Sequence, residues 1–350
     1  MDTKVVGIDV HKDQHVAALI DHAGRELATL SFANSPSGFE KFTAWIELHD
    51  AADARIGIEN AASYGQTLTV ALSAAGLDCV DVPPWRTHRH RKTMGPAKSD
   101  PIDAQAIARV VLLLGDQLAP ALQPDLCRAL GILCAVREQE VRDRTKTIMR
   151  LRALWAGVSP VDEAAAKDLA HPTQIRRLRR LKVPGGIVQK TAQDAIRMLA
   201  GRIAEHTARL KTLEADMATL LAEHGNPFEK LTGAATLTSA KLIAQIGDPK
   251  RFKNAAAFAA YNGTGPIQCG SGKTSGRHRL NRAGNRQLNT ALHTIALVQA
   301  RCHPDAMAYI ERRTTKDGKT PREARRALKR HLSNVVYRQI TAWADAQALT

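Results

Sequence analysis

Short apolar runs alternate with segments of helical spacing through the first 110 residues. Alternating or continuous apolar positions predict strands over residues 4–9, 15–20, 26–32, 54–59 and 78–82. Apolar positions three and four residues apart predict helices over residues 37–49 and 65–75, and another helix from Ser99 to about Arg109. The predicted order of elements is therefore βββαβαβα.

This order is that of the ribonuclease H fold, in which the first and fourth strands are neighbours and the last helix crosses their carboxyl ends. A doubly wound dinucleotide-binding sheet is disfavoured, because no GxGxxG sequence follows the first strand. The sequence thus predicts an α/β N-terminal domain of the ribonuclease H-like class.

Four carboxylates lie at the ends of these segments. Asp9 closes the first strand and Glu59 the fourth, while Asp100 and Asp103 begin the last helix three residues apart, on one helical face. The order of elements predicts that all four converge, as hard oxygen ligands suited to Mg²⁺, for which we expect Mn²⁺ to substitute. Asp100 also fits a helix N-cap before Pro101, so one of the four has a purely structural interpretation.

Long helices dominate the rest of the chain, over about 123–156, 187–223 and 321–349. The second repeats apolar residues in heptads, and only His206 interrupts the seam. Such a repeat is typical of a helical hairpin or of a coiled coil between subunits, and packing on its own domain is equally compatible with it. We expect a ribonuclease H-like domain over 1–122, a helical coiled-coil oligomerisation region over 123–226 and a mainly helical domain over 227–350.

Positive charge is concentrated at the C-terminal end. The chain has a net charge of +16, and residues 231–350 hold 20 Lys and Arg against 6 Asp and Glu. A basic domain joined to a nearly neutral remainder is typical of a protein that binds a polyanion. Together with a metal site, it indicates chemistry on phosphodiesters.

A Gly-rich basic loop covers residues 261–286. Glycines allow close approach of a ligand to the backbone, and Arg side chains match phosphate oxygens in a bidentate way. Its hydroxyls, Ser271, Thr274 and Ser275, could bind phosphate or supply a nucleophile, and the residues alone leave both roles open. The stretch Gly270–Thr274 lacks the spacing of a P-loop, so nucleotide hydrolysis is disfavoured.

Two further basic segments, residues 86–92 and 176–182, are expected to contact nucleic-acid backbone without reading sequence. Trp85, beside the first, is predicted to pack in the core rather than to stack on a base. The residues predicted to bind nucleic acid are Arg86, Arg89, Arg91, Lys92, Lys98, Arg176, Arg177, Arg179, Arg180, Lys273, Arg277, Arg279, Arg282 and Arg286.

Four short motifs, in order, carry a resemblance to a known family: residues 7–12, 57–60, 98–104 and a block from Ser271 to Asn285. Together they resemble the DEDD transposases of the IS110 insertion-sequence family, to which the Piv and MooV DNA invertases are related. The resemblance covers essentially the whole chain. It implies a RuvC-like N-terminal domain, a coiled-coil middle and a C-terminal transposase domain.

The resemblance also implies the chemistry and the partners. Asp9, Glu59, Asp100 and Asp103 fall on the metal ligands of the family, and Ser271 falls on its nucleophile. A protein of this kind is a serine recombinase that acts on donor and target DNA, guided by a bridge RNA encoded by the element. Because strand exchange holds two duplexes at once, we expect a homo-oligomer, a dimer or a tetramer.

Two other functions remain compatible with the residues. In a metal-dependent, structure-specific nuclease, the carboxylates would activate water and Ser271 would only bind phosphate. In a non-catalytic nucleic-acid-binding protein, the carboxylates would be ordinary strand-end groups. The sequence has no membrane-spanning run, no signal-peptide pattern and five cysteines without CxxC spacing, so we expect a cytoplasmic, nucleoid-associated bacterial protein and no membrane partner.

Overall fold

The structure is a computed structural model that describes residues 3–93, 99–158, 171–268, 278–281 and 284–347. The chain divides into two compact units. Unit 1 comprises Met1–Pro124 together with the short segment Asp248–Asn254. Unit 2 comprises Asp125–Gly247 and Ala255–Thr350.

A six-stranded sheet forms the centre of unit 1, in the order β3-β2-β1-β4-β5-β6. Its strands are β1 (Val5–Val10), β2 (Gln14–Ile20), β3 (Glu26–Ala33), β4 (Arg55–Glu59), β5 (Cys79–Val82) and β6 (Ala119–Pro120). β1 pairs in parallel with β4, and β4 in parallel with β5, whereas β2, β3 and β6 are antiparallel to their neighbours. The predicted neighbours, the first and fourth strands, are therefore paired.

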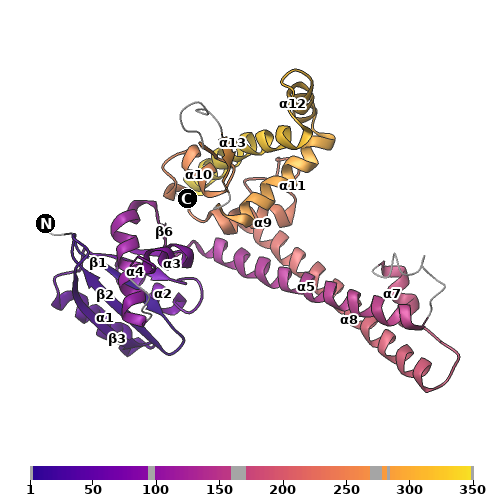
Figure 1. The fold of residues 1–350 in the computed structure, drawn as a ribbon, viewed down its shortest axis with the longest axis horizontal. Helices are drawn as coiled ribbons and strands as arrows, with labels where there is room; N and C mark the ends of the chain where they lie inside the picture. The colour runs from indigo at the N-terminus through magenta and orange to yellow at the C-terminus, as the bar shows by residue number, and fades with distance from the viewer. Residues whose placement is uncertain (1–2, 94–98, 159–170, 269–277, 282–283, 348–350) are drawn as a thin grey trace. The chain divides into compact units, whose positions relative to one another are not determined.

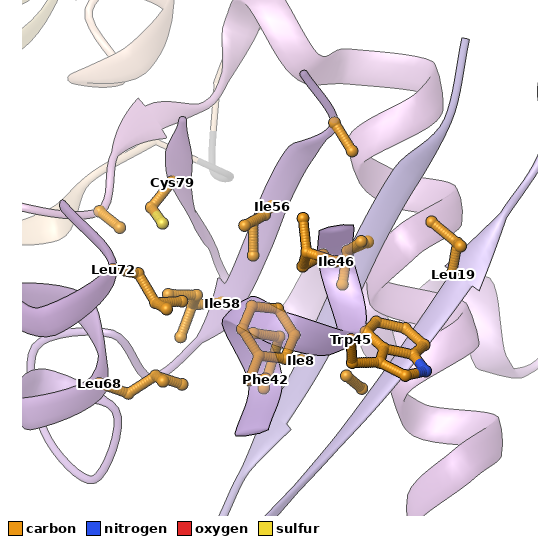
Figure 2. Packing of buried hydrophobic residues seen from close by; sticks show 14 of the residues in the cluster. Ile8, Leu19, Phe42, Trp45, Ile46, Ile56, Ile58, Leu68, Leu72 and Cys79 are labelled. Atoms are coloured by element: carbon orange, nitrogen blue, oxygen red, sulfur yellow. The ribbon is translucent and has the colours of Figure 1, made fainter. Parts of the chain in front are cut away.

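Helices cover both faces of this sheet (Figure 1). α1 (Pro36–Leu48) and α2 (Gln66–Ala74) pack on one face, where their apolar side chains join those of alternate strand residues such as Ile8, Ile56 and Ile58. Figure 2 shows this cluster, with Phe42 and Trp45 of α1 lying over the strands. On the other face, α4 (Asp100–Leu114) packs against β1, β2 and β4.

One short helix of unit 1 differs from the sequence-based expectation. The segment after β5 forms α3 (Pro84–Arg91), which begins with Pro84 at a position that favours a helix start. Its eight residues are mostly Arg and His and have no apolar repeat, so the helix left no periodic signal in the sequence.

A long helical hairpin forms one part of unit 2. α5 (Asp125–Val158) and α8 (Ile187–His224) run side by side, with the short α7 (Pro172–Leu178) packed on α8 (Figure 1). The predicted heptad positions Ile196, Ile203 and Met217 are buried. His206 interrupts this seam as expected, and its Nδ1 lies 2.6 Å from Oε2 of Glu140 on α5. The apolar seam of α8 thus packs within the chain, as in a hairpin.

A helical bundle forms the other part of unit 2. Its helices are α9 (Thr236–Ile246), α10 (Ala255–Tyr261), α11 (Arg286–Cys302), α12 (Pro304–Thr315) and α13 (Pro321–Gln347). α9 joins the hairpin to the bundle, since it packs on α5, α8 and α11, and Lys241 Nζ of α9 lies 2.9 Å from Oε1 of Glu138 on α5. A small antiparallel pair, β7 (Pro266–Gln268) and β8 (His278–Leu280), follows α10.

The fold is therefore a mixed α/β sheet domain followed by a mostly helical remainder. The finer expectation of three domains stays a prediction. No helix in the described ranges is long and apolar enough to cross a membrane.

Candidate functional site

Two paired glycines bring α4 close to the sheet. Gly7 of β1 is the register partner of Gly57 of β4. A Cβ added at Gly7 would lie 2.2 Å from the carbonyl oxygen of Ala104, and one at Gly57 would lie 2.3 Å from a methyl group of Val111. Side chains at these positions would therefore hold α4 away from the strands. The two glycines set the distance between the helix and the ends of β1 and β4.

The carboxylates lie where this approach is closest. Ile8 pairs with Ile58, so that Asp9 and Glu59 follow side by side at the carboxyl ends of neighbouring strands. Asp100 and Asp103 lie in the first turn of α4, and the N-cap residue is Ser99. The N-cap interpretation of Asp100 is therefore wrong, because Asp100 is already inside the helix.

The electrostatics of Asp9 reflect this crowding. The pKa of Asp9 is raised to about 6: burial is the main cause, the negative charges of Glu59, Asp103 and Asp100 add to the rise, and His11 opposes it. Burial also raises the pKa of Glu59, with Asp103 adding to the shift and Thr87 and Arg91 opposing it. Each carboxylate thus lies within electrostatic range of another, and a divalent cation would relieve their repulsion.

His11 contacts two of the four carboxylates. Its Nε2 is 3.3 Å from Oδ2 of Asp9 and 3.6 Å from Oδ1 of Asp100. Asp9, His11 and Asp100 each present one ligand atom, and these atoms all lie within 4.8 Å of one another. The sequence-based prediction did not include His11. Its signal was its position two residues after Asp9, since alternate residues of an extended chain point to the same side.

Arg91 of α3 also reaches the carboxylates. Its Nη1 lies 3.1 Å from Oδ1 and 3.4 Å from Oδ2 of Asp103, and its Nη2 lies 3.1 Å from Nδ1 of His88. Arg91 was predicted as a nucleic-acid contact. In the structure its guanidinium pairs with Asp103, one of the four acids. A backbone phosphate could take the place of that carboxylate as the partner of Arg91.

The other basic residues of α3 are more open. Arg89 and Lys92 are exposed, and Arg86 is half-buried with its guanidinium 5.0 Å from the ring centroid of Trp85. Trp85 is 54% exposed. The expectation that Trp85 packs in the core is therefore wrong.

The arginines of the second basic segment share one exposed surface. Arg176, Arg177, Arg179 and Arg180 are all exposed on and just after α7. Between them, Ile175 and Leu178 are buried against α8. The segment is a small amphipathic helix.

The predicted serine lies in the connection between β7 and β8. Ser271, Lys273 and Arg277, as well as Arg282 and Lys98, lie outside the described residues. Of the basic residues predicted nearby, Arg279 belongs to β8 and Arg286 is exposed in the first turn of α11.

Asparagines hold the base of this connection in place. Buried Asn262 donates from Nδ2 to Oγ of Ser333 (2.8 Å), and Nδ2 of Asn289 donates to the Asn262 carbonyl oxygen (2.9 Å). Asn285 caps α11 and donates to Oε1 of Gln245 (2.9 Å). Gly263 and Gly284 are in close contact, since a Cβ at Gly284 would lie 2.3 Å from the Gly263 nitrogen. The backbone before β7 and after β8 is thus fixed to the bundle.

Comparison with known proteins identifies the family. Residues 6–160 match a transposase family profile of the DEDD type, and residues 225–311 match that of the transposase IS116/IS110/IS902 family. The two matches together cover about two thirds of the chain and include the sheet of unit 1 and the β7–β8 pair of unit 2.

Curated relatives align along nearly the whole length. The chain is 24% identical to an insertion element IS116 protein of Streptomyces clavuligerus, over 88% of each chain. It is 24% identical to an insertion element IS900 protein of Mycobacterium paratuberculosis, over 95% of this chain and 94% of that protein. It is 22% identical to a pilin gene-inverting protein of Moraxella bovis, over 96% and 95% respectively. The chain belongs to the IS116/IS110/IS902 family of transposases.

Proposed function

We propose that this protein is a recombinase that cuts and rejoins DNA through a phosphoserine intermediate at Ser271, using divalent metal held by Asp9, Glu59, Asp100 and Asp103. The observation that carries the proposal is the gathering of these carboxylates around Asp9, whose pKa is raised to about 6 by burial and by its acidic neighbours. Such a group of acids is stable in its ionised form when it has cations to bind.

The donor set fits hard divalent ions. Carboxylate oxygens suit Mg²⁺ and Mn²⁺, and the imidazole nitrogen of His11 favours Mn²⁺ relative to a site made of oxygens alone. When bound, such ions polarise a scissile phosphate and stabilise charge in the transition state. The pairing of the first and fourth strands beneath α4 supports a ribonuclease H-like, RuvC-like fold for unit 1.

The protein's own side chains have separate tasks in this proposal. Asp9 is buried and Glu59 is half-buried, so these two provide the inner ligands, and Asp100, with its side chain 58% exposed, provides an outer ligand on the solvent side. Arg91 neutralises Asp103 in the absence of substrate and can transfer its hydrogen bonds to a phosphate oxygen.

The Ser271 hydroxyl attacks the phosphorus of the strand. One phosphate ester bond to a sugar oxygen breaks as one ester bond to Ser271 Oγ forms, and the hydroxyl proton goes to the departing sugar oxygen. The number of phosphate esters is conserved, so the reverse reaction with another strand needs no ATP. The hydrogen bonds that fix Asn262 before β7 and Asn285 after β8 support this role, since a nucleophile must be held on a firm base.

The further parts of the proposal rest on the family resemblance. A bridge RNA pairs with donor and target DNA, and a dimer or tetramer holds both duplexes. The serine and the carboxylates belong to different compact units, so the active site is completed when they meet, within one subunit or between subunits.

Ser271→Ala tests the proposal. We expect wild-type protein, incubated with cognate DNA, guide RNA and Mg²⁺, to give a covalent protein–DNA band on a denaturing gel. The band should vanish in Ser271→Ala and in Asp9→Asn, and persist in Ser275→Ala. Loss of the band only in Ser275→Ala, or an adduct that forms equally in Ser271→Ala, would refute the assignment of the nucleophile.

A nuclease is the second candidate. It is favoured by the fact that all four carboxylates, His11 and Arg91 belong to unit 1. In that case Ser271→Ala would still cleave DNA, no adduct would form, and Asp9→Asn would abolish cleavage.

A further inference from the structure

Charge is strongly segregated along the α5–α8 hairpin. The described residues of its distal half, 142–158 and 171–202 with α7, hold thirteen Lys and Arg against two Asp and Glu. The proximal half, residues 125–141 and 203–224, holds four against seven. The near-neutral total of the first 230 residues therefore conceals a basic distal half. Such segregation is unnecessary for packing two helices.

α7 presents a rigid basic surface at this distal half. Its buried Ile175 and Leu178 pack in one cluster with Ile196 and Leu199 of α8 and Trp155 of α5. Because the apolar side is held, the exposed side is fixed in place. That side carries the exposed cations Arg176, Arg177, Arg179, Arg180 and Lys182.

A polar hollow of about 430 Å³ lies between α5 and α8. Its cations come from both helices: Lys146 and Arg150 from α5, and Arg202 and Arg209 from α8. Asp143 and Glu205 also line it, and Lys146 and Arg209 form ion pairs with Asp143 and Glu140. Arg150 and Arg202 are exposed, so the hollow keeps two cations turned to solvent.

The composition of the distal half fits a duplex backbone rather than a single strand. Single-strand binding uses aromatic side chains on which bases stack. Trp155 is the only Phe, Trp or Tyr between residues 142 and 202, and it is buried. Exposed Lys and Arg side chains supply phosphate contacts, which position a duplex without requiring stacked bases.

We propose that the distal half of the hairpin, with α7 and the hollow at Arg150 and Arg202, is a docking surface for the phosphate backbone of duplex DNA. The surface binds without sequence preference and lies on a different unit from the carboxylates. The distal part of α5, residues 142–158, is about 25 Å long at 1.5 Å per residue, which matches about seven base pairs of duplex. The choice of DNA rests on the proposed function, whereas the surface itself does not depend on the chemistry of Ser271.

The salt dependence of binding tests this surface. Full-length protein carrying Ser271→Ala is titrated with a labelled, non-cognate 30-base-pair DNA duplex at several salt concentrations, with fluorescence anisotropy as the readout. Replacing Arg176, Arg177, Arg179 and Arg180 with Gln should reduce the slope of log K against log [salt] by up to about 3.6, since each phosphate contact contributes about 0.9. Arg150→Gln with Arg202→Gln should reduce it by up to about 1.8.

A matched control separates this surface from net charge. Lys41, Lys211, Lys230 and Lys253 are exposed and scattered, and their replacement with Gln removes the same charge as the α7 variant. The proposal predicts a slope change of less than about 1 for this control. Equal slope changes in the two quadruple variants would overturn the proposal, as would tighter binding of a duplex RNA of equal length. Circular dichroism checks that each variant is folded. Failure here leaves the Ser271 adduct assay unaffected, so the two proposals fail separately.

Discussion

At the scale of single residues, Asp9 combines a position that the sequence predicts well with a pKa that lies far above its usual value. Asp9 follows an apolar strand run, so its position at a strand end could be predicted from the pattern alone. Its pKa could not, because the shift to about 6 depends on burial and on three acids that are distant in sequence or across the sheet.

The shift makes stability depend on pH. The pKa of Asp9 is higher in the folded than in the unfolded chain, so the folded state binds more protons between about pH 4 and 6 and loses stability as pH rises through this window. Asp9→Asn removes this pH-dependent loss of stability. In EDTA, we expect the free energy of unfolding of Asp9→Asn relative to wild type to increase by about 2–3 kcal/mol between pH 4 and pH 7, measured by urea unfolding. A difference that stays constant with pH would contradict the assigned shift.

The contacts that two side chains make with the acids could not be predicted from the sequence. His11 and Arg91 contact the acids, yet only Arg91 was noticed, and as a nucleic-acid contact. Histidines and arginines are common on solvated surfaces, so residue type alone does not separate these two from Arg89 or His90. The arrangement of α3 against α4 separates them, and that packing is tertiary.

At the scale of elements, strands β1 to β5 could be predicted to within about one residue, because their apolar runs end at polar or Gly-containing turns, whereas the two-residue β6 was not predicted. The long helices were predictable because their apolar residues recur at helical spacing. α3 was not, because it lacks an apolar face. Residues 236–246 form α9, whose Ser239 is buried and donates to the carbonyl oxygen of Ala234 (2.8 Å).

Gly7 tests how α4 is positioned. In Gly7→Ala, the new methyl group meets the backbone of Ala104 and Ala108, so α4 must move away from β1. We expect a loss of about 1–3 kcal/mol in stability, as in other overpacked cores, and weaker Mn²⁺ binding because Asp100 and Asp103 move with the helix. Urea unfolding and calorimetric Mn²⁺ titration give the two readouts.

Gly201→Ala is the matched control for this change. Gly201 lies within α8 with nothing close to its added Cβ. It should gain about 0.5–1 kcal/mol, because Ala is the better helix residue, and keep its Mn²⁺ affinity. Unchanged stability and metal affinity in Gly7→Ala would mean that α4 does not depend on this approach.

At the scale of the whole molecule, metal binding and DNA docking are assigned to different compact units. Hydrogen exchange can detect this separation of the metal site from the other unit. Added Mn²⁺ should slow hydrogen exchange in β1, in β4 and at the start of α4, since binding to the folded state suppresses local opening there. Peptides from α11 to α13 should change little.

Variants sharpen this exchange experiment. Asp9→Asn should lose the Mn²⁺-dependent protection, and Ser271→Ala should keep it, because the serine belongs to the other unit. Protection that spreads evenly over both units, or that survives in Asp9→Asn, would argue against a metal centre at these carboxylates.

The segment Asp248–Asn254 has a consequence for how this protein can be divided. The backbone leaves unit 1 after Pro124, returns for the seven residues Asp248–Asn254 and leaves again before Ala255. The chain therefore passes between the two units three times instead of once. A truncation at residue 124 would therefore remove part of the very unit it was meant to isolate. For the same reason, a single crossover between two genes could not replace the whole of unit 1, because the segment Asp248–Asn254 would remain.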